Sequence, residues 1–315
     1  MKKTNKRLLA AGGIFCVAGL LLFGVGVVAG GKNYIKTADL NRISGSAMMD
    51  SSDSHAILSK TKIDAFSAVN IDLRNIDLEV KEAEDNDFYI AYNIETNDGM
   101  IPLSYQVQDH TLNIVEKKGH ESSSYIHIDI NFLQEMLGQS HVIENSNKVT
   151  LYIPKKTKLN AFSCKMGLGN LNMESLNAKQ AVISNDDGDI IVGGGVIENL
   201  ELSDNLGDLN LKNTEFVDSR IEMSDGDVTG ENVTFSGKNK ITSSLGDITL
   251  NISQEVLENL SVQAETDLGE IKIPEELGEV MTNEDDEQRL VSEKKTQDFL
   301  QIKSADGDIT IKAAK

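Results

Sequence analysis

The clearest pattern of hydrophobic and polar positions in the chain is a tripeptide of glycine, an acid or asparagine, and a branched aliphatic residue. It recurs with spacings of 19, 19, 19, 20, 23 and 38 residues, and its glycines are Gly169, Gly188, Gly207, Gly226, Gly246, Gly269 and Gly307. The last spacing is twice 19. A fixed period near 20 residues is typical of architectures in which each repeat stacks on its neighbour.

The positions around each glycine alternate in character. Two residues after it the chain has Leu171, Ile190, Leu209, Val228, Ile248, Ile271 and Ile309. Four residues after it stand Met173, Val192, Leu211, Gly230, Leu250, Ile273 and Ile311. Five residues before it stand Cys164, Ile183, Leu202, Ile221, Ile241, Ala264 and Ile302. Alternation with a period of two predicts strands with one buried face. We therefore expect two short strands per repeat, joined by a glycine turn.

These repeats predict an all-β fold. Strands 19 residues apart leave no room for a connecting helix, so equivalent strands must stack in parallel, about 4.8 Å apart. The prediction is a parallel β-solenoid of about 19-residue rungs, and the usual sense of strand crossovers makes the coil right-handed. No rung buries enough apolar surface to be stable alone, so the stack is the stable unit.

The regularity of the pattern sets the expected boundaries. Residues 161–315 form the regular solenoid, and residues 58–160 form an irregular β region that starts it, with a degenerate first rung at 61–80. A charged loop at about residues 283–298 interrupts the stack where one rung is missing. The strands around Ile302 and Ile309 are expected to complete the C-terminal end.

The N-terminal segment predicts a membrane anchor. Residues 8–30 contain no charged residue and follow four cations, Lys2, Lys3, Lys6 and Arg7. A helix of this length crosses a hydrocarbon core of about 30 Å, and the preceding cations keep the N-terminus cytoplasmic. We predict a cytoplasmic tip and transmembrane helix at 1–31, a juxtamembrane stalk at 32–57, and an extracytoplasmic C-terminal domain of a single-pass protein. A cleaved signal peptide is the alternative, although its apolar core is usually shorter.

Charge narrows the range of partners. The chain has 30 Lys and Arg against 50 Asp and Glu, a net charge of −20, and removing the four N-terminal cations leaves −24. Such a surface repels nucleic acid and anionic lipid headgroups. It suits cationic peptides, divalent cations or a basic protein, and solubility alone is the alternative explanation. Of the two cysteines, Cys16 lies in the apolar run, so we expect no disulfide, and Cys164 occupies a buried aliphatic position.

The repeats of glycine, aspartate and aliphatic residue resemble the bacterial "putative adhesin" β-strand-repeat family of unknown function, which includes LiaG-like envelope proteins. The strand from Val149 to Pro154 before the first regular rung is also similar to that family, and the likeness covers roughly residues 60–315. The resemblance implies a membrane-tethered β-solenoid at the cell membrane of a bacterium, expected to be Gram-positive, with a role in envelope stress or surface interaction. It implies no catalytic residues.

No pattern of catalytic or cofactor-binding residues is found. The acids recur because the turn recurs, and no column of Lys or Arg accompanies them, as a polysaccharide-cleaving β-helix would require. Zinc, phosphate-loop and nucleophile-elbow motifs are missing from the sequence. Adjacent turns would bring acids close together, and the weak calcium candidates are Asp189, Asp208, Asp227 and Asp247. Solvated turn residues are the favoured interpretation of these four.

The sequence therefore predicts a non-catalytic, membrane-anchored envelope protein that uses no cofactor and interacts with an envelope protein or a cell-wall component, and a role in the envelope stress response is one expectation. A surface adhesin that binds an external ligand is the alternative, and a polysaccharide-acting β-helix enzyme ranks third. No nucleic-acid partner is expected. The sequence does not predict an oligomeric state.

Overall fold

The structure is a computed structural model that describes residues 48–49, 55–96, 100–117, 147–284 and 286–314. Contacts within the chain separate residues 1–46 from residues 47–315, and all described residues belong to the second unit. The predicted transmembrane helix and most of the predicted stalk lie outside the described residues. Among the described residues, no helix has the length and apolar character needed to cross a bilayer.

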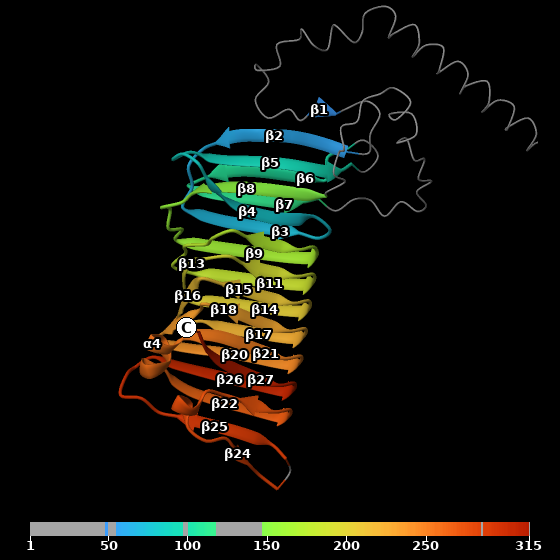
Figure 1. The fold of residues 1–315 in the computed structure, drawn as a ribbon. Helices are drawn as coiled ribbons and strands as arrows, with labels where there is room; N and C mark the ends of the chain where they lie inside the picture. The colour runs from blue at the N-terminus through green and yellow to red at the C-terminus, as the bar shows by residue number, and fades with distance from the viewer. Residues whose placement is uncertain (1–47, 50–54, 97–99, 118–146, 285, 315) are drawn as a thin grey trace, which may run out of the picture. The chain divides into compact units, whose positions relative to one another are not determined.

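The regular part of this unit is a stack of rungs whose strands pair in parallel (Figure 1). The strands before the glycine turns are β9 (Ala161–Leu168), β11 (Ala181–Asp187), β14 (Leu200–Leu206), β17 (Arg220–Asp225) and β20 (Lys238–Leu245). The strands after the turns are β10 (Leu171–Met173), β12 (Ile190–Val192), β15 (Leu209–Lys212), β18 (Val228–Glu231) and β21 (Ile248–Ser253). Each strand pairs with its equivalent one rung on, as Ile190 does with Leu209. The predicted parallel stacking is confirmed, while the handedness of the coil stays a prediction.

Each regular rung also has a third side, so the expectation of two strands per repeat is wrong. The third strands β13 (Gly195–Glu198), β16 (Thr214–Val217) and β19 (Thr234–Ser236) form a parallel sheet of their own. Single bridges from Leu159 to Ala178 and from Ala178 to Ile197 extend this side toward the N-terminal rungs. Each third strand buries too few aliphatic residues to show an alternating pattern. In the rung after β19, α4 (Gln254–Asn259) follows β21 instead of a third strand.

The degenerate first rung exists, although more than seventy residues separate it from the next rung along the chain. Strand β3 (Ala68–Leu73) pairs with β9, and β4 (Asp77–Ala83) pairs with β10, so that Leu78 lies beside Leu171. Beyond this rung, antiparallel pairings join β1 (Met48–Met49), β2 (His55–Ile63), β5 (Phe88–Glu95) and β8 (Lys148–Pro154). A second antiparallel pair, β6 (Leu103–Gln108) and β7 (Thr111–Glu116), adjoins β3. These mixed pairings close the N-terminal end of the stack.

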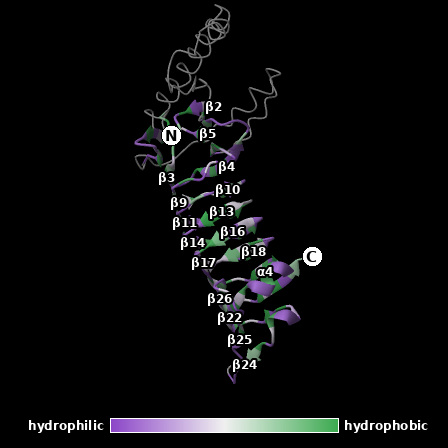
Figure 2. Cartoon of the chain, turned by 90° about the vertical axis from the view of Figure 1, so that its left-hand side faces the viewer, coloured by the Kyte–Doolittle hydropathy of each residue, from purple (hydrophilic) through white to green (hydrophobic). Residues whose placement is uncertain are grey.

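At the C-terminal end the order of rungs in space departs from their order along the chain. Strand β26 (Phe299–Asp306) lies between β20 and β22 (Ser261–Leu268) (Figure 1), and Figure 2 also shows β26 between β17 and β22. Strand β27 (Ile309–Ala314) lies between β21 and β23 (Ile271–Lys272). The prediction that the final strands complete the C-terminal end is therefore wrong. The sequence could not settle this point, because a rung of the same pattern fits between any two neighbours.

The end of the stack is instead formed by the segment that precedes β26. After η2 (Glu275–Leu277), the short strand β24 (Met281–Thr282) pairs with β25 (Gln288–Ser292), and β25 pairs in antiparallel fashion with β22. All of β25 falls in the predicted charged loop, and its Leu290 is fully buried. An antiparallel strand at this point ends the parallel stack, because a further parallel rung has no matching partner strand.

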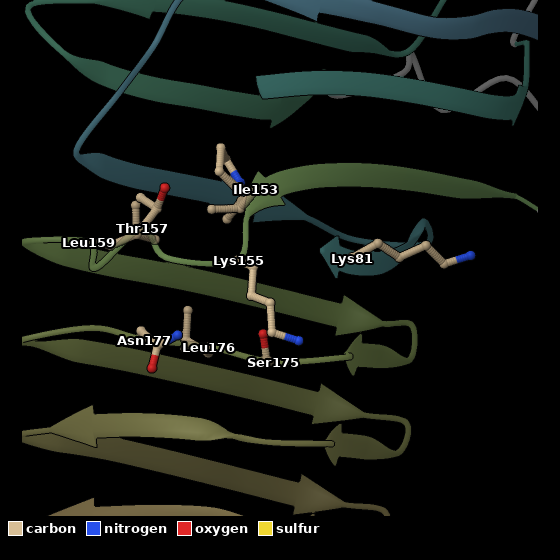
Figure 3. Close-up of a pocket in the computed structure, with 9 residues that line it drawn as sticks. Lys81, Ile153, Lys155, Thr157, Leu159, Ser175, Leu176 and Asn177 are labelled. Atoms are coloured by element: carbon tan, nitrogen blue, oxygen red, sulfur yellow. The ribbon is translucent and has the colours of Figure 1, made fainter. Parts of the chain in front are cut away.

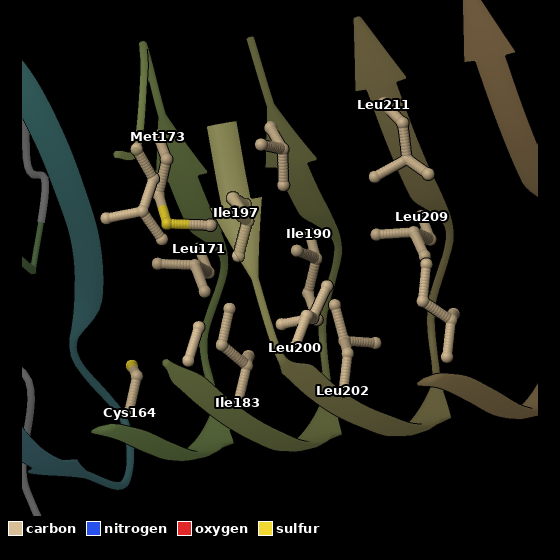
Figure 4. Packing of buried hydrophobic residues seen from close by; sticks show 14 of the residues in the cluster. Cys164, Leu171, Met173, Ile183, Ile190, Ile197, Leu200, Leu202, Leu209 and Leu211 are labelled. Carbon is tan, nitrogen blue, oxygen red and sulfur yellow. The ribbon is translucent and has the colours of Figure 1, made fainter. Parts of the chain in front are cut away.

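The core runs along the stack as columns of aliphatic side chains, and Figure 4 shows a part of them between Cys164 and Leu211. One column contains Leu171, Ile190, Leu209, Val228, Ile248 and Ile309, all fully buried. It faces the column that contains Cys164, Ile183 and Leu202, each at most 2% exposed, so the expectation that Cys164 is a buried small hydrophobe is confirmed. Burial raises the pKa of the Cys164 thiol far above its ordinary value.

We expect Leu209→Ala to lower the free energy of unfolding by about 2–5 kcal/mol, since it removes a fully buried side chain and leaves a cavity. Leu206→Ala, three residues earlier, truncates a side chain that is 49% exposed and should change stability by less than about 0.5 kcal/mol. Urea unfolding followed by circular dichroism measures both. Equal losses from the two substitutions would contradict the assignment of Leu209 to the core and Leu206 to the surface.

Candidate interaction surface

The turn between the first two strands of each rung is held by very close backbone contacts. Gly226 has φ of 132° and Gly246 has φ of 116°, a region that side chains other than glycine rarely adopt. A Cβ on Gly226 would lie 2.0 Å from the carbonyl oxygen of Gly207, and one on Gly246 would lie 2.2 Å from that of Gly226. The same contact recurs at Gly188, Gly207, Gly307 and Gly269. Each of these positions therefore requires glycine, because any side chain would collide with the backbone of the neighbouring rung.

The first rung shows the exception. Ile76 occupies the place of the glycine there, and the next glycine, Gly169, packs against the Ile76 carbonyl with 2.9 Å between that oxygen and a built Cβ. Among the described residues, no glycine turn of an earlier rung packs against Ile76, and its side chain is accommodated and only 1% exposed.

A second set of contacts forms what we call the acid ladder. The backbone N–H one residue after each glycine donates to the side-chain oxygen of the equivalent residue in the rung before, at 2.8–3.0 Å. In spatial order the ladder consists of Asp77, Asn170, Asp189, Asp208, Asp227, Asp247, Asp308 and Glu270. Neighbouring carboxylates about 5 Å apart repel by about 1 kcal/mol in water, and these N–H groups offset that repulsion.

The four weak calcium candidates belong to the ladder, and calcium binding by them stays a prediction. Asp189, Asp208, Asp227 and Asp247 each use one carboxylate oxygen to accept the N–H of the next rung. Within the described residues, no group of three or more His, Cys, Asp or Glu side chains is placed to hold a metal ion. Each of these four carboxylates therefore links its rung to the next one.

In the last rungs a lysine side chain lies beside the acid ladder. Lys272 Nζ lies 2.6 Å from Asp308 Oδ2 and 3.2 Å from Glu270 Oε2. This ammonium and the Glu270 N–H hold the pKa of Asp308 below its ordinary value. Asp308 stands between Asp247 and Glu270 in space, although it follows both of them in the sequence.

The residue before each glycine forms a second row, which we call the leucine–aspartate column. In spatial order it reads Leu168, Asp187, Leu206, Asp225, Leu245, Asp306 and Leu268. The carbonyl of each residue after the first accepts the glycine N–H of the neighbouring rung at 2.8–3.1 Å, so the row is fixed by the backbone. Leucine and aspartate alternate without a break only because β26 lies between β20 and β22.

The leucines of this column are exposed. Their exposed fractions are 61% for Leu168, 49% for Leu206, 48% for Leu245 and 64% for Leu268. Scattered exposed leucines are ordinary, but these four stand in one line, on every second rung. They contribute nothing to the core, and their regular placement is typical of a contact surface.

We call the residues from two before to one after each glycine the glycine edge. Its acids are Asp186, Asp187, Asp189, Asp208, Asp225, Asp227, Asp247, Asp267, Glu270, Asp306 and Asp308, and none of its positions holds Lys or Arg. At its C-terminal end an open concavity is lined by Asp267, Leu268, Asp286, Gln288 and Asp306. The edge therefore combines regularly spaced apolar side chains with a dense negative charge.

A buried carboxyl group lies directly beneath this edge. Asp204 is 1% exposed and pairs across strands with Asn185, which is equally buried. Among the described residues, neither carboxylate oxygen of Asp204 nor Oδ1 of Asn185 has a hydrogen-bond partner. Burial raises the pKa of Asp204 to about 6. The described residues form no ion pair with Asp204, so nothing of opposite charge compensates its ionised form.

Elsewhere, the described residues include a notch between the first rungs and β8, lined among others by Lys81, Lys155, Ser175 and Asn177 (Figure 3). Its volume of about 10 Å³ is that of a single water molecule. Both lysines are engaged in ion pairs, Lys81 with Glu79 at 2.9 Å and Lys155 with Glu82 at 2.9 Å. The Lys155 ammonium lowers the pKa of Glu82. The notch is a structural junction of paired charges.

The chain belongs to the Toastrack DUF4097 family, whose sequence model matches residues 66–243 and 194–312. The predicted resemblance to a "putative adhesin" repeat family is confirmed. No curated protein matches the chain.

Three solved structures illustrate the similarity. A "putative cell adhesion protein" from Clostridium sporogenes is 12% identical, with 82% of this chain and 99% of that chain covered and a TM-score of 0.32. A "putative adhesin" from Bacteroides fragilis is 16% identical, with 80% and 95% covered and a TM-score of 0.39. A "putative adhesin" from Parabacteroides merdae is 16% identical, with 83% and 97% covered and a TM-score of 0.37.

Sequence reasoning found the glycines and most of the acid ladder but missed the leucine–aspartate column. A signal was present, since the residue before successive glycines alternates from Leu168 to Leu245. In chain order the alternation then breaks, because Leu268 precedes Asp306. Only the order of rungs in space restores it.

Gly226→Ala should lower the free energy of unfolding by at least about 2 kcal/mol, because the new methyl group would collide with the Gly207 carbonyl in a strained backbone conformation. Gly194→Ala is the control, since a Cβ there meets nothing closer than 3.6 Å and should change stability by less than about 1 kcal/mol. Chemical unfolding compares the two. If Gly226→Ala is as stable as Gly194→Ala, the close contact between rungs does not exist.

Asp204→Asn should stabilise the protein at pH 8 by about 2–3 kcal/mol and leave stability at pH 4 nearly unchanged. The pKa of Asp204 is raised in the folded state. Protonated Asp204 therefore contributes its full share of the free energy of unfolding below pH 4, and this share is lost as the pH rises through 6. Thermal or urea unfolding between pH 4 and pH 8 measures the difference, with the pH 4 values as internal control. The same wild-type-to-variant difference at both pH values would show that Asp204 is not a buried titrating group.

Proposed function

We propose that this chain is a non-catalytic interaction protein of the bacterial cell envelope, and that the glycine edge is its binding surface. The observation that carries the proposal is the leucine–aspartate column, in which four exposed leucines are held in one line by the backbone hydrogen bonds of the turns. A rigid repeat scaffold that displays such a row suits the binding of another macromolecule.

The exposed leucines of the edge do not stabilise the fold, which favours a role for them in binding. Truncating Leu206 or Leu245 removes no core contact, because both side chains are about half exposed. Leucine at these positions lowers solubility without stabilising the fold, whereas a polar residue would fit the same backbone. A partner that covers the column would desolvate these side chains and recover about 25 cal/mol for each Å² buried.

The proposal places the domain outside the cytoplasm, tethered by the apolar residues 8–30. The supporting observation is the uncharged run preceded by Lys2, Lys3, Lys6 and Arg7, with a surplus of acids in the rest of the chain. A partner in the same membrane or in the adjacent wall would then meet the edge at close range. An adhesin that binds an external ligand is the second candidate, and it would use the same exposed row.

A photoreactive amino acid placed at Leu206 or Leu245 in the full-length chain should give a discrete crosslinked product in intact cells. Val182, a 39% exposed residue on the same sheet away from the edge, is the matched control position and should give none. The product should also stay with the membrane after a high-pH wash, because the anchor retains the chain.

Three results would count against parts of the proposal. Equal crosslinking at Val182 and Leu206 would show that the edge is not the binding surface. Release of the chain by the high-pH wash would contradict the proposed membrane anchor. Crosslinking at Leu206 only when external wall or host material is added would favour the adhesin over the envelope accessory protein.

A further inference from the structure

The spacing of side chains on the glycine edge restricts what can bind there. Adjacent rungs are about 4.8 Å apart, so successive leucines of the column are about 9.6 Å apart, with an aspartate midway between them. Leu206, Asp225 and Leu245 are one such unit. A partner that uses the whole column must present apolar groups at this interval and cationic groups between them.

An α-helix that runs along the stack meets both requirements. Residues seven apart lie on the same face of a helix at about 10.5 Å, and residues three and four apart lie between them at about 4.5 and 6 Å on that face. An extended strand repeats on one face about every 6.8 Å and matches neither the leucines nor the aspartates. A polyproline helix repeats every 9.3 Å or so but turns its intermediate residues to other faces. Only the α-helix places a cation over the intervening aspartate.

The charge of the edge requires that the helix be basic. Beside the column runs the acid ladder, and Asp189, Asp208 and Asp227 each commit only one carboxylate oxygen to it. Among the described residues, no bond to the second oxygen of these three is formed. A second copy of this chain would bring acid against acid, and nucleic acid or an anionic membrane would be repelled. A Lys- or Arg-rich helix is the complementary partner.

We propose that the glycine edge binds a basic amphipathic α-helix whose apolar residues recur every seven positions, with Lys or Arg three and four positions after each. This inference rests on the proposed function and specifies its partner. A helix of about 20 residues spans the six rung intervals from Leu168 to Leu268, because its length of about 30 Å matches about 29 Å of stack. The acidic concavity around Leu268 receives one end of that helix.

The test uses the full-length chain in nanodiscs of neutral phosphatidylcholine, with empty nanodiscs subtracted. The probe is a fluorescent 21-residue peptide, about 31 Å long as a helix. It carries Leu every seventh residue, Lys three and four residues after each Leu, and Ala and Gln elsewhere. A peptide of the same composition with its leucines scattered around the helix is the register control. A Pro-rich peptide with Leu at every third residue represents the polyproline alternative.

Fluorescence anisotropy should show that the heptad peptide binds the wild-type chain at least tenfold more tightly than the scattered peptide does. Leu206→Ser combined with Leu245→Ser should weaken binding at least tenfold. Asp225→Asn should weaken binding less and reduce its dependence on salt, because one screened charge contact is lost. Val182→Ser, an exposed substitution off the edge, should leave binding unchanged. Circular dichroism melts should show that these exposed substitutions leave the fold intact.

Equal binding of the heptad and scattered peptides, or no effect of the double leucine substitution, would overturn the inference. Tighter binding of the Pro-rich peptide than of the heptad peptide would show that the edge binds a polyproline helix and not an α-helix. If no peptide binds while crosslinks at Leu206 persist in cells, the helix is wrong and the proposed function stands. If those crosslinks are also missing, both fail.

Discussion

The structure depends on one steric constraint, the approach of each turn glycine to the carbonyl oxygen of the glycine one rung away. At Gly226 that approach leaves only 2.0 Å for a Cβ atom, so no other residue fits without moving the rung. The contact fixes the spacing and the lateral alignment of the rungs at the turn. The backbone hydrogen bonds on either side of each glycine follow from that alignment, and so does the acid ladder. A parallel stack with one edge in strict register is the result.

Strict register at the turn gives the glycine edge its chemical character. Residues at equivalent positions form straight columns. A residue type that recurs once per rung therefore forms a continuous row on the surface of the stack. One position supplies acceptors that join rung to rung, and another supplies the alternating leucines and aspartates. Beneath them, the inward-facing position holds polar residues such as Asn185 and Asp204, which are 1% exposed. Burying an acid there costs stability, and that cost is smallest when Asp204 is protonated.

Much of this fold could be predicted from the sequence because the glycine contact imposes a fixed period. The strands flanking each turn, the parallel stacking and the degenerate first rung all follow from the columns of aliphatic residues. The third strand could not be predicted, because the strands around Ile197, Phe216 and Phe235 bury too little to show a period of two. The place of the last rung could not be predicted either, since β26 and β27 match the pattern anywhere in the stack. That one displacement also hid the leucine–aspartate column, because the alternation exists in space and not along the chain.

The central claim is that a partner covers the glycine edge in the cell, and cysteine accessibility tests it most directly. Single cysteines replace Leu206 or Leu245 on the edge and Val182 off the edge, in a chain that carries Cys16→Ala and whose Cys164 is buried. Labelling by a membrane-impermeant maleimide is then timed in intact cells and on the purified full-length protein. If a partner covers the edge, the two edge cysteines react several-fold more slowly in cells than after purification, while the cysteine at position 182 reacts at the same rate in both. If each of the three cysteines reacts in cells at the same rate as in the purified protein, no partner covers the edge.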